Sequence, residues 1–72
     1  MASKQDIKAV VDQALAHAQD HDYRPLADDR DMLETGIFEA SLELDIVLSR
    51  QDKETAISEL ISRLPELDEP VG

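Results

Sequence analysis

The sequence contains no cysteine and no tryptophan, and its 72 residues include one tyrosine, one phenylalanine and two glycines. Without cysteine, disulfides, thiolate zinc sites and thiol redox chemistry are excluded. Two aromatic rings are too few for a base-stacking platform, and two glycines do not make a glycine-rich phosphate loop. The composition therefore removes several common means of binding nucleic acids and nucleotides.

Long apolar runs are absent as well. No run approaches the roughly 20 residues that a membrane span needs, and the first residues, MASKQDIK, lack the apolar core of a secretory signal. We therefore expect a soluble, cytoplasmic protein that makes no membrane contact.

Basic side chains are scarce, because seven Lys and Arg stand against seventeen Asp and Glu and give a formal charge of −10. A surface of this charge repels phosphate backbones, so we expect no direct binding of nucleic acid. The same charge keeps a small protein in solution and can steer it toward a basic surface on a partner.

The chain has the length of one small domain, which we predict for residues 1–66, followed by a flexible acidic tail at residues 67–72. A core of this size contributes roughly 3–5 kcal/mol, and small domains commonly add a disulfide, a metal or a second subunit. Because disulfides are excluded, a second subunit is one way to bury more apolar surface.

Apolar residues recur at steps of three and four between Ile7 and Ala18, which predicts a helix from about Ser3 to His21. Ser3 and Asp6 have the spacing of a capping box at the start of this helix. Arg24-Pro25 then interrupts the pattern, since proline disfavours helical geometry in the residue before it.

A second helix is expected to begin after Asp28 or Asp29, either of which can cap it. Gly36 disfavours the helix interior and predicts a bend or break. The apolar residues with helical spacing form a core stripe that extends beyond Gly36 and consists of Leu33, Ile37, Ala40, Leu44, Val47 and Leu48.

A third helix is expected after a turn at residues 49–53, with Glu59 and Arg63 paired at i, i+4 and Pro65 at its end. No strand-like alternation is present. The predicted fold class is all-α: a small three-helix bundle, or a helical hairpin plus a third helix, with a break near Gly36.

The second helix has more large apolar residues than one face can hold. Phe38, Leu42 and Ile46 fall at i, i+4 and i+8 and form a second stripe. In one arrangement, the first and third helices pack on opposite stripes and the second helix is the central member of the bundle. In the other, both helices pack on the core stripe and the second stripe stays free for another chain.

Residues for catalysis or metal binding are few. His17 and His21 stand at i, i+4, a spacing that can place two imidazoles on one metal, with Asp20 or Asp22 as a further ligand. The glutamate of the HExxH zinc-protease pattern is missing, and a histidine near a helix C-terminus also gains from the helix dipole. With no nucleophile elbow and no paired catalytic carboxylates, we expect no enzyme activity, small-molecule substrate, cofactor or metal.

Gly36-Ile37-Phe38 followed by Leu44-Asp45-Ile46 resembles the start of the second helix in acyl and peptidyl carrier proteins. The position of the phosphopantetheine-bearing serine is occupied by Ala40. Ser41 is displaced by one residue, which turns it by about 100° around the helix. The resemblance therefore implies, at most, a degenerate carrier-like domain.

The function that these features favour is a noncatalytic protein-interaction module with an adaptor, antitoxin-like or inhibitor role. It would bind a second copy of the chain or another protein through an apolar helix face. An alternative is an acidic mimic of nucleic acid that occupies a basic groove on another protein, with Asp28, Asp29, Asp31 and Glu34 as its surface. The expected partner-binding residues are Phe38, Leu42 and Ile46, with Glu39, Glu43 and Asp45 as a polar rim.

Overall fold

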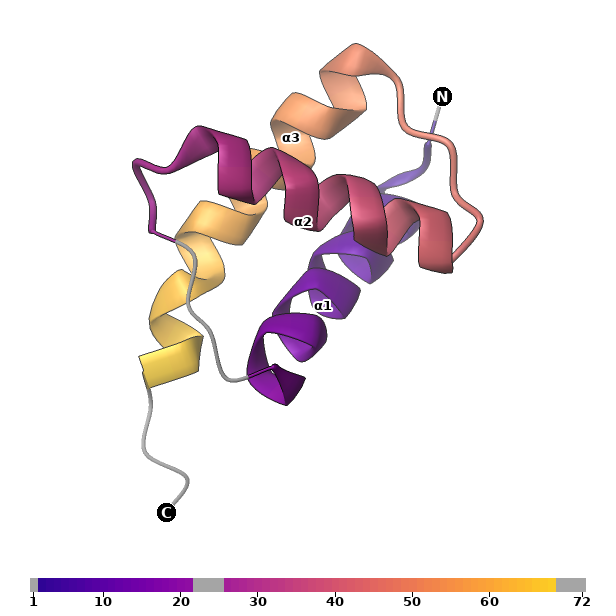
Figure 1. The fold of residues 1–72 in the computed structure, drawn as a ribbon. Helices are drawn as coiled ribbons and strands as arrows, with labels where there is room; N and C mark the ends of the chain where they lie inside the picture. Colours follow the sequence, from indigo (N-terminus) through magenta and orange to yellow (C-terminus); the bar gives the residue numbers. More distant parts are fainter. Residues whose placement is uncertain (1, 22–25, 69–72) are drawn as a thin grey trace.

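The computed structural model describes residues 2–21 and 26–68, although the side chain of residue 68 is left out. These residues form helices α1 (Lys4–Asp20), α2 (Arg30–Glu43) and α3 (Arg50–Arg63), followed by a 3₁₀ helix, η1 (Leu64–Asp68). Each α-helix contacts the other two, and α2 lies across α1 and α3 (Figure 1). The structure confirms the all-α, three-helix fold class.

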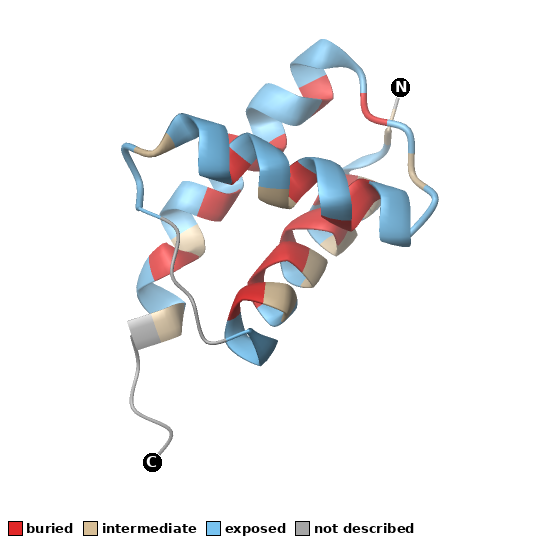
Figure 2. Ribbon diagram, in the orientation of Figure 1, coloured by how far each residue is buried: buried red, intermediate tan, exposed pale blue. Residues whose placement is uncertain are grey.

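The core lies where the three helices face one another (Figure 2). Val10 and Val11 of α1 are completely buried, as is Ala56 of α3, and Leu33 and Ile37 of α2 are 1% exposed. The apolar spacing of α1 predicted its buried face, since the residues with this spacing are all buried: Ile7, Val10, Val11, Ala14, Leu15 and Ala18. None of the described helices is long and apolar enough to cross a lipid bilayer.

Side-chain caps define where each helix begins. The Ser3 hydroxyl accepts a 3.1 Å hydrogen bond from the N–H of Asp6, and the Asp6 carboxylate accepts one from the N–H of Ser3, which confirms the predicted capping box. Asp29 caps α2 by accepting from the N–H of Met32 at 3.2 Å. Of the two candidates for this cap, the structure therefore selects Asp29.

The start of α3 differs from the prediction. Ser49 and Asp52 form a second capping box, with both hydrogen bonds at 3.1 Å, so α3 begins at Arg50. The predicted interruption between the two helices is confirmed, but it lies between Glu43 and Arg50 and not at residues 49–53. Polar residues in the first turn of a helix can satisfy its free N–H groups, so residues 50–53 belong to α3.

The end of α2 explains where the connection lies instead. Asp45 has φ 55°, its N–H donates to the carbonyl of Leu42, and the N–H of Ile46 donates to the carbonyl of Ser41 at 2.9 Å. This is a Schellman motif with aspartate in the left-handed position. The predicted core stripe consequently ends early: Leu44 is exposed and Val47 is 88% exposed, whereas Leu48 is buried from the loop as expected for a core residue.

Gly36 lies inside α2, which is continuous from Arg30 to Glu43, so the predicted break there is wrong. Its φ is not positive, and a Cβ added at this position would have no heavy atom within 4 Å. The helix accepts the glycine because its cost, roughly 1 kcal/mol, is smaller than the packing contributed by the neighbouring core residues.

The C-terminal segment also differs from expectation. α3 ends before Pro65, but the chain continues as η1, in which Leu67 packs against the core. The predicted boundary between domain and tail, after residue 66, therefore falls inside η1. Residues 22–25 and 69–72, which include Arg24-Pro25 and the rest of the expected tail, lie outside the described residues.

Arg63 does not form the predicted pair with Glu59. It instead donates to Asp12 of α1 and, at 2.9 Å, to Glu66 of η1. The hydrogen bonds with Glu66 and Asp12 raise the pKa of Arg63, and the same contact with Arg63 lowers the pKa of Glu66. Arg63 thus joins α3 to α1 and η1, and spacing within one helix does not predict such contacts.

Candidate functional site

The outward face of α2 carries two large apolar side chains. Phe38 is 51% exposed and Leu42 is 62% exposed, and they are neighbours on the helix because they stand at i, i+4. The opposite face of the same helix holds Leu33 and Ile37 in the core. α1 and α3 therefore pack on one side of α2. The predicted arrangement in which they pack on opposite stripes of α2 is wrong. We call Phe38 and Leu42 the docking face.

Ile46 does not belong to the docking face. The Schellman turn removes it from the helix, and it is partly buried against the core. The prediction that Ile46 is a third exposed member of the stripe is therefore wrong, because it assumed that the helix continues beyond Glu43. Asp45, predicted as part of the rim, occupies the left-handed position of this turn.

One flank of the docking face is acidic and lies on the side of α1. Glu39 approaches the Nε2 atom of His17 to 3.9 Å, and Glu43 accepts a hydrogen bond from the side-chain amide of Gln13. The Glu39 side chain nevertheless remains 53% exposed. A carboxylate has several acceptor positions, so both groups can accept further hydrogen bonds from a partner. We call Glu39 and Glu43 the acidic flank.

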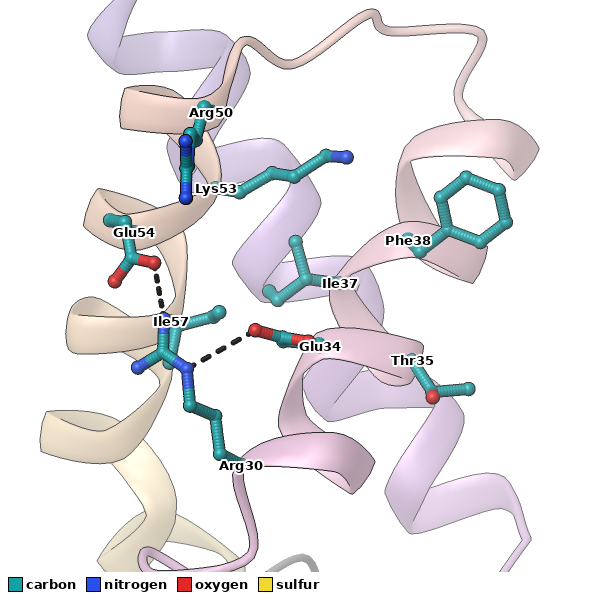
Figure 3. A pocket seen from close by; sticks show the side chains of 9 residues that line it. All are labelled: Arg30, Glu34, Thr35, Ile37, Phe38, Arg50, Lys53, Glu54 and Ile57. Carbon is teal, nitrogen blue, oxygen red and sulfur yellow. Dashed lines mark hydrogen bonds and ion pairs between the residues drawn. The ribbon is translucent and has the colours of Figure 1, made fainter.

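The other flank of the docking face lies over a cleft of about 570 Å³ between α2 and α3. Three cationic side chains line the cleft, Arg30, Arg50 and Lys53, in a chain with seven Lys and Arg (Figure 3). Ile37 and Ile57 form its apolar floor, and Phe38 stands at its edge. The spacing of residues along the sequence does not reveal this cleft, because residues of α3 come beside α2 only through the tertiary fold.

The two ends of the cleft differ in charge. At one end, Arg30 donates to Glu34 at 3.1 Å and to Glu54 of α3 (Figure 3), and the hydrogen bond with Glu54 raises the pKa of Arg30. At the other end, the Lys53 ammonium lies 6.0 Å from the centre of the Phe38 ring, close enough for a cation–π contact. Within residues 2–21 and 26–68, neither Arg50 nor Lys53 has a carboxylate at ion-pair distance. We call Arg50 and Lys53 the basic flank.

The residues of the proposed nucleic-acid mimic gather at the start of α2, but half of them have other roles. Asp29 caps the helix and Glu34 is paired with Arg30. Asp28 and Asp31 remain exposed.

The two histidines lie at the end of α1, with ring centres 4.3 Å apart. His17 also approaches Glu39. In the part of the chain that the structure describes, no group of three or more His, Cys, Asp or Glu side chains is arranged to hold a metal ion. Asp22, suggested as a further ligand, is outside that part.

The structure does not support the resemblance to carrier proteins. Gly36 lies within α2 and not before its start, and Ala40, at the position of the modified serine, is 3% exposed. Ser41 is also buried, and its hydroxyl donates a 2.7 Å hydrogen bond to the carbonyl of Phe38. Neither position presents a hydroxyl to solvent.

Comparison of the chain with protein-family models, curated proteins and solved structures finds no match.

Proposed function

We propose that this protein is a noncatalytic interaction module that binds a protein partner through the docking face of α2. The observation that carries the proposal is the exposure of Phe38 and Leu42, side by side on a helix whose other face is already filled by α1 and α3. Adjacent exposed apolar side chains on a small domain commonly mark an interaction site.

The composition of the face supports this mode of binding. An aromatic side chain and a leucine at i, i+4 are the anchors with which a helix enters an apolar groove, and charged residues at the edges form a polar rim. Val47, in the loop after α2, adds another exposed apolar side chain, although its spacing predicts a core residue. An adaptor, antitoxin-like or inhibitor role is consistent with such a surface.

The acidic mimic of nucleic acid is a weaker proposal. Asp29 caps α2 and Glu34 pairs with Arg30, so both carboxylates already have partners within the protein. Arg30 lies between them in the sequence, at the start of α2. A mimic needs a continuous negative field, and a guanidinium beside the carboxylates interrupts it.

The experiment that tests the docking face compares the wild-type protein with the Leu42→Glu variant. Each is used as tagged bait in cell extract and analysed by quantitative mass spectrometry, and the solution mass of each is measured by light scattering. We expect a specific partner, either another protein or a second copy of the chain, to be present with the wild type and lost with Leu42→Glu. Equal binding by the two proteins, with equal helicity by circular dichroism, would contradict the proposal.

A further inference from the structure

The docking face has flanks of opposite charge. The basic flank, Arg50 and Lys53, lies on the side of α3, and the acidic flank, Glu39 and Glu43, lies on the side of α1. The Lys53 ammonium extends toward the Phe38 ring (Figure 3), so Lys53 borders the docking face directly, and Arg50 lies farther along the same cleft. An apolar centre with one positive and one negative edge is complementary in charge to itself.

A two-fold axis decides which edges meet. If the axis runs parallel to α2, the α3 side of one copy faces the α1 side of the other, so each basic flank meets an acidic flank. If the axis runs across α2, each flank meets its own copy, and two pairs of carboxylates face each other. Like charges placed opposite each other disfavour an interface. The charges therefore favour the parallel arrangement.

We infer that the partner of the docking face is a second copy of this chain, packed with its α2 parallel to the first around a two-fold axis. This inference rests on the proposed docking function. A two-fold interface uses the same surface on both copies, so Phe38 and Leu42 pack against their counterparts. The exposed apolar centre and both charged flanks are then all used by one occupant.

The positions along the helices match in this arrangement. Along the cleft, α3 runs in the direction opposite to α2 (Figure 3). Arg30, at the start of α2, pairs with Glu54, whereas Lys53, earlier on α3, lies beside Phe38, later on α2. In a parallel pair of helices, residues at equal height face each other. Lys53 then lies near Glu39 of the second copy, and Arg50, one turn earlier on α3, adds a second positive charge on the same side.

The residues at the start of α2 limit the length over which the two α2 helices can stay in contact. Asp31 and Thr35 continue the outward face toward the start of α2, and parallel packing would bring the two Asp31 carboxylates together. Packed helices cross at an angle, commonly about 20° or 50°. With the crossing point at Phe38 and Leu42, the helices diverge before Asp31, and the interface is small. Small interfaces are typical of weak, reversible association.

Charge reversal gives a direct test. One variant carries Arg50→Glu and Lys53→Glu, and the other carries Glu39→Lys and Glu43→Lys. In the first, all four flanks of a dimer are negative, and in the second all four are positive, so each variant alone should be monomeric. Mixed together, each flank again meets its opposite, and a heterodimer should form.

Sedimentation velocity over a hundredfold concentration range measures this at about 0.15 M salt, where charges beyond about 8 Å are screened. We expect a wild-type dimer, self-association at least tenfold weaker in each variant, and recovery to near wild-type affinity in the equimolar mixture. The matched control, Lys4→Glu with Lys8→Glu, changes the net charge equally on α1 and should dimerise like the wild type. Circular dichroism establishes that every variant is folded.

The outcomes separate this inference from the docking function. A wild type that is monomeric at every concentration overturns the inference, while loss of a foreign partner in Leu42→Glu would still support docking. A dimer that both charge variants retain, or a mixture that does not recover, overturns the parallel arrangement. A dimer weakened as much by the α1 control shows that net charge and not the flanks is responsible, which also overturns it. A dimer unaffected by Leu42→Glu contradicts the docking face itself.

Discussion

The carboxylate of Asp52 accepts a 2.9 Å hydrogen bond from the backbone N–H of Ala2, which joins the start of the chain to the first turn of α3. The same oxygen accepts a hydrogen bond from the N–H of Ser49 within the capping box. Asp52 is 6% exposed. The hydrogen bond from the N–H of Ala2, and after it the one from the N–H of Ser49, hold the pKa of Asp52 below its ordinary value. Hydrogen bonds donated to a carboxylate favour its ionised form.

Asp52 should make stability depend on pH in the acid range. A carboxylate with a lowered folded-state pKa stabilises the protein above its unfolded pKa, near 3.9, and this stabilisation is lost as the pH falls further. We expect Asp52→Asn to be less stable than the wild type at neutral pH, with the difference shrinking as the pH falls below about 4. Urea unfolding at several pH values measures it, with Asp28→Asn as an exposed control. A difference that does not change with pH would refute this.

Gly36→Ala should stabilise the protein. Gly36 is helical, its φ is not positive, and an added Cβ meets no heavy atom within 4 Å. Alanine in a helix interior is favoured over glycine by roughly 1 kcal/mol. We expect the free energy of unfolding to rise by about that amount in urea denaturation. A decrease would indicate that α2 bends at Gly36 in solution.

Asp45 should respond to glycine and alanine in opposite directions. Its φ of 55° is unfavourable for residues with a Cβ, and glycine adopts it without strain. We expect Asp45→Gly to raise the free energy of unfolding by about 0.5 kcal/mol and Asp45→Ala to lower it by about 1 kcal/mol. Thermal unfolding of the two variants gives the order, and similar effects of both would argue against the Schellman motif.

Leu42 and Ile37 should differ sharply in their effect on folding, although both lie on α2. Leu42 is exposed and Ile37 is 1% exposed. For the monomer, we expect Leu42→Ala to change the free energy of unfolding by less than about 0.5 kcal/mol and Ile37→Val to lower it by about 1 kcal/mol. Measuring the unfolding of dilute protein, where association is weak, provides the comparison. A large loss from Leu42→Ala would place that side chain in the core.

What the sequence could predict was local. Ser3 with Asp6 and the candidates at Asp28 and Asp29 identified two helix starts, because an N-cap involves residues only two or three positions apart. The apolar period of α1 likewise identified its buried face. For the same reason, the i, i+4 spacing of Phe38 and Leu42 predicts that they share one stripe of the helix, but not whether another helix covers that stripe.

What failed depended on a rare backbone state or on distant contacts. Nothing in the apolar pattern marks Asp45 as the residue that ends α2, since glycine is usual at that position. As a result, the apolar pattern predicts Ile46 on the exposed stripe and a turn where α3 begins, and both predictions differ from the structure. The pairing of Arg63 with Asp12 and the position of Lys53 beside Phe38 result from the packing of one helix on another. The spacing of residues within one helix does not predict such contacts.

The packing of α1 against both later helices also bears on how the protein is made. During translation α1 emerges first, and its apolar face, with Val10 and Val11 at its centre, has no complete cover until α3 has left the ribosome. Almost the whole domain must therefore be synthesised before its core can close. Chains of this kind acquire their native contacts late, and a truncated product exposes the apolar face that the finished protein hides most thoroughly.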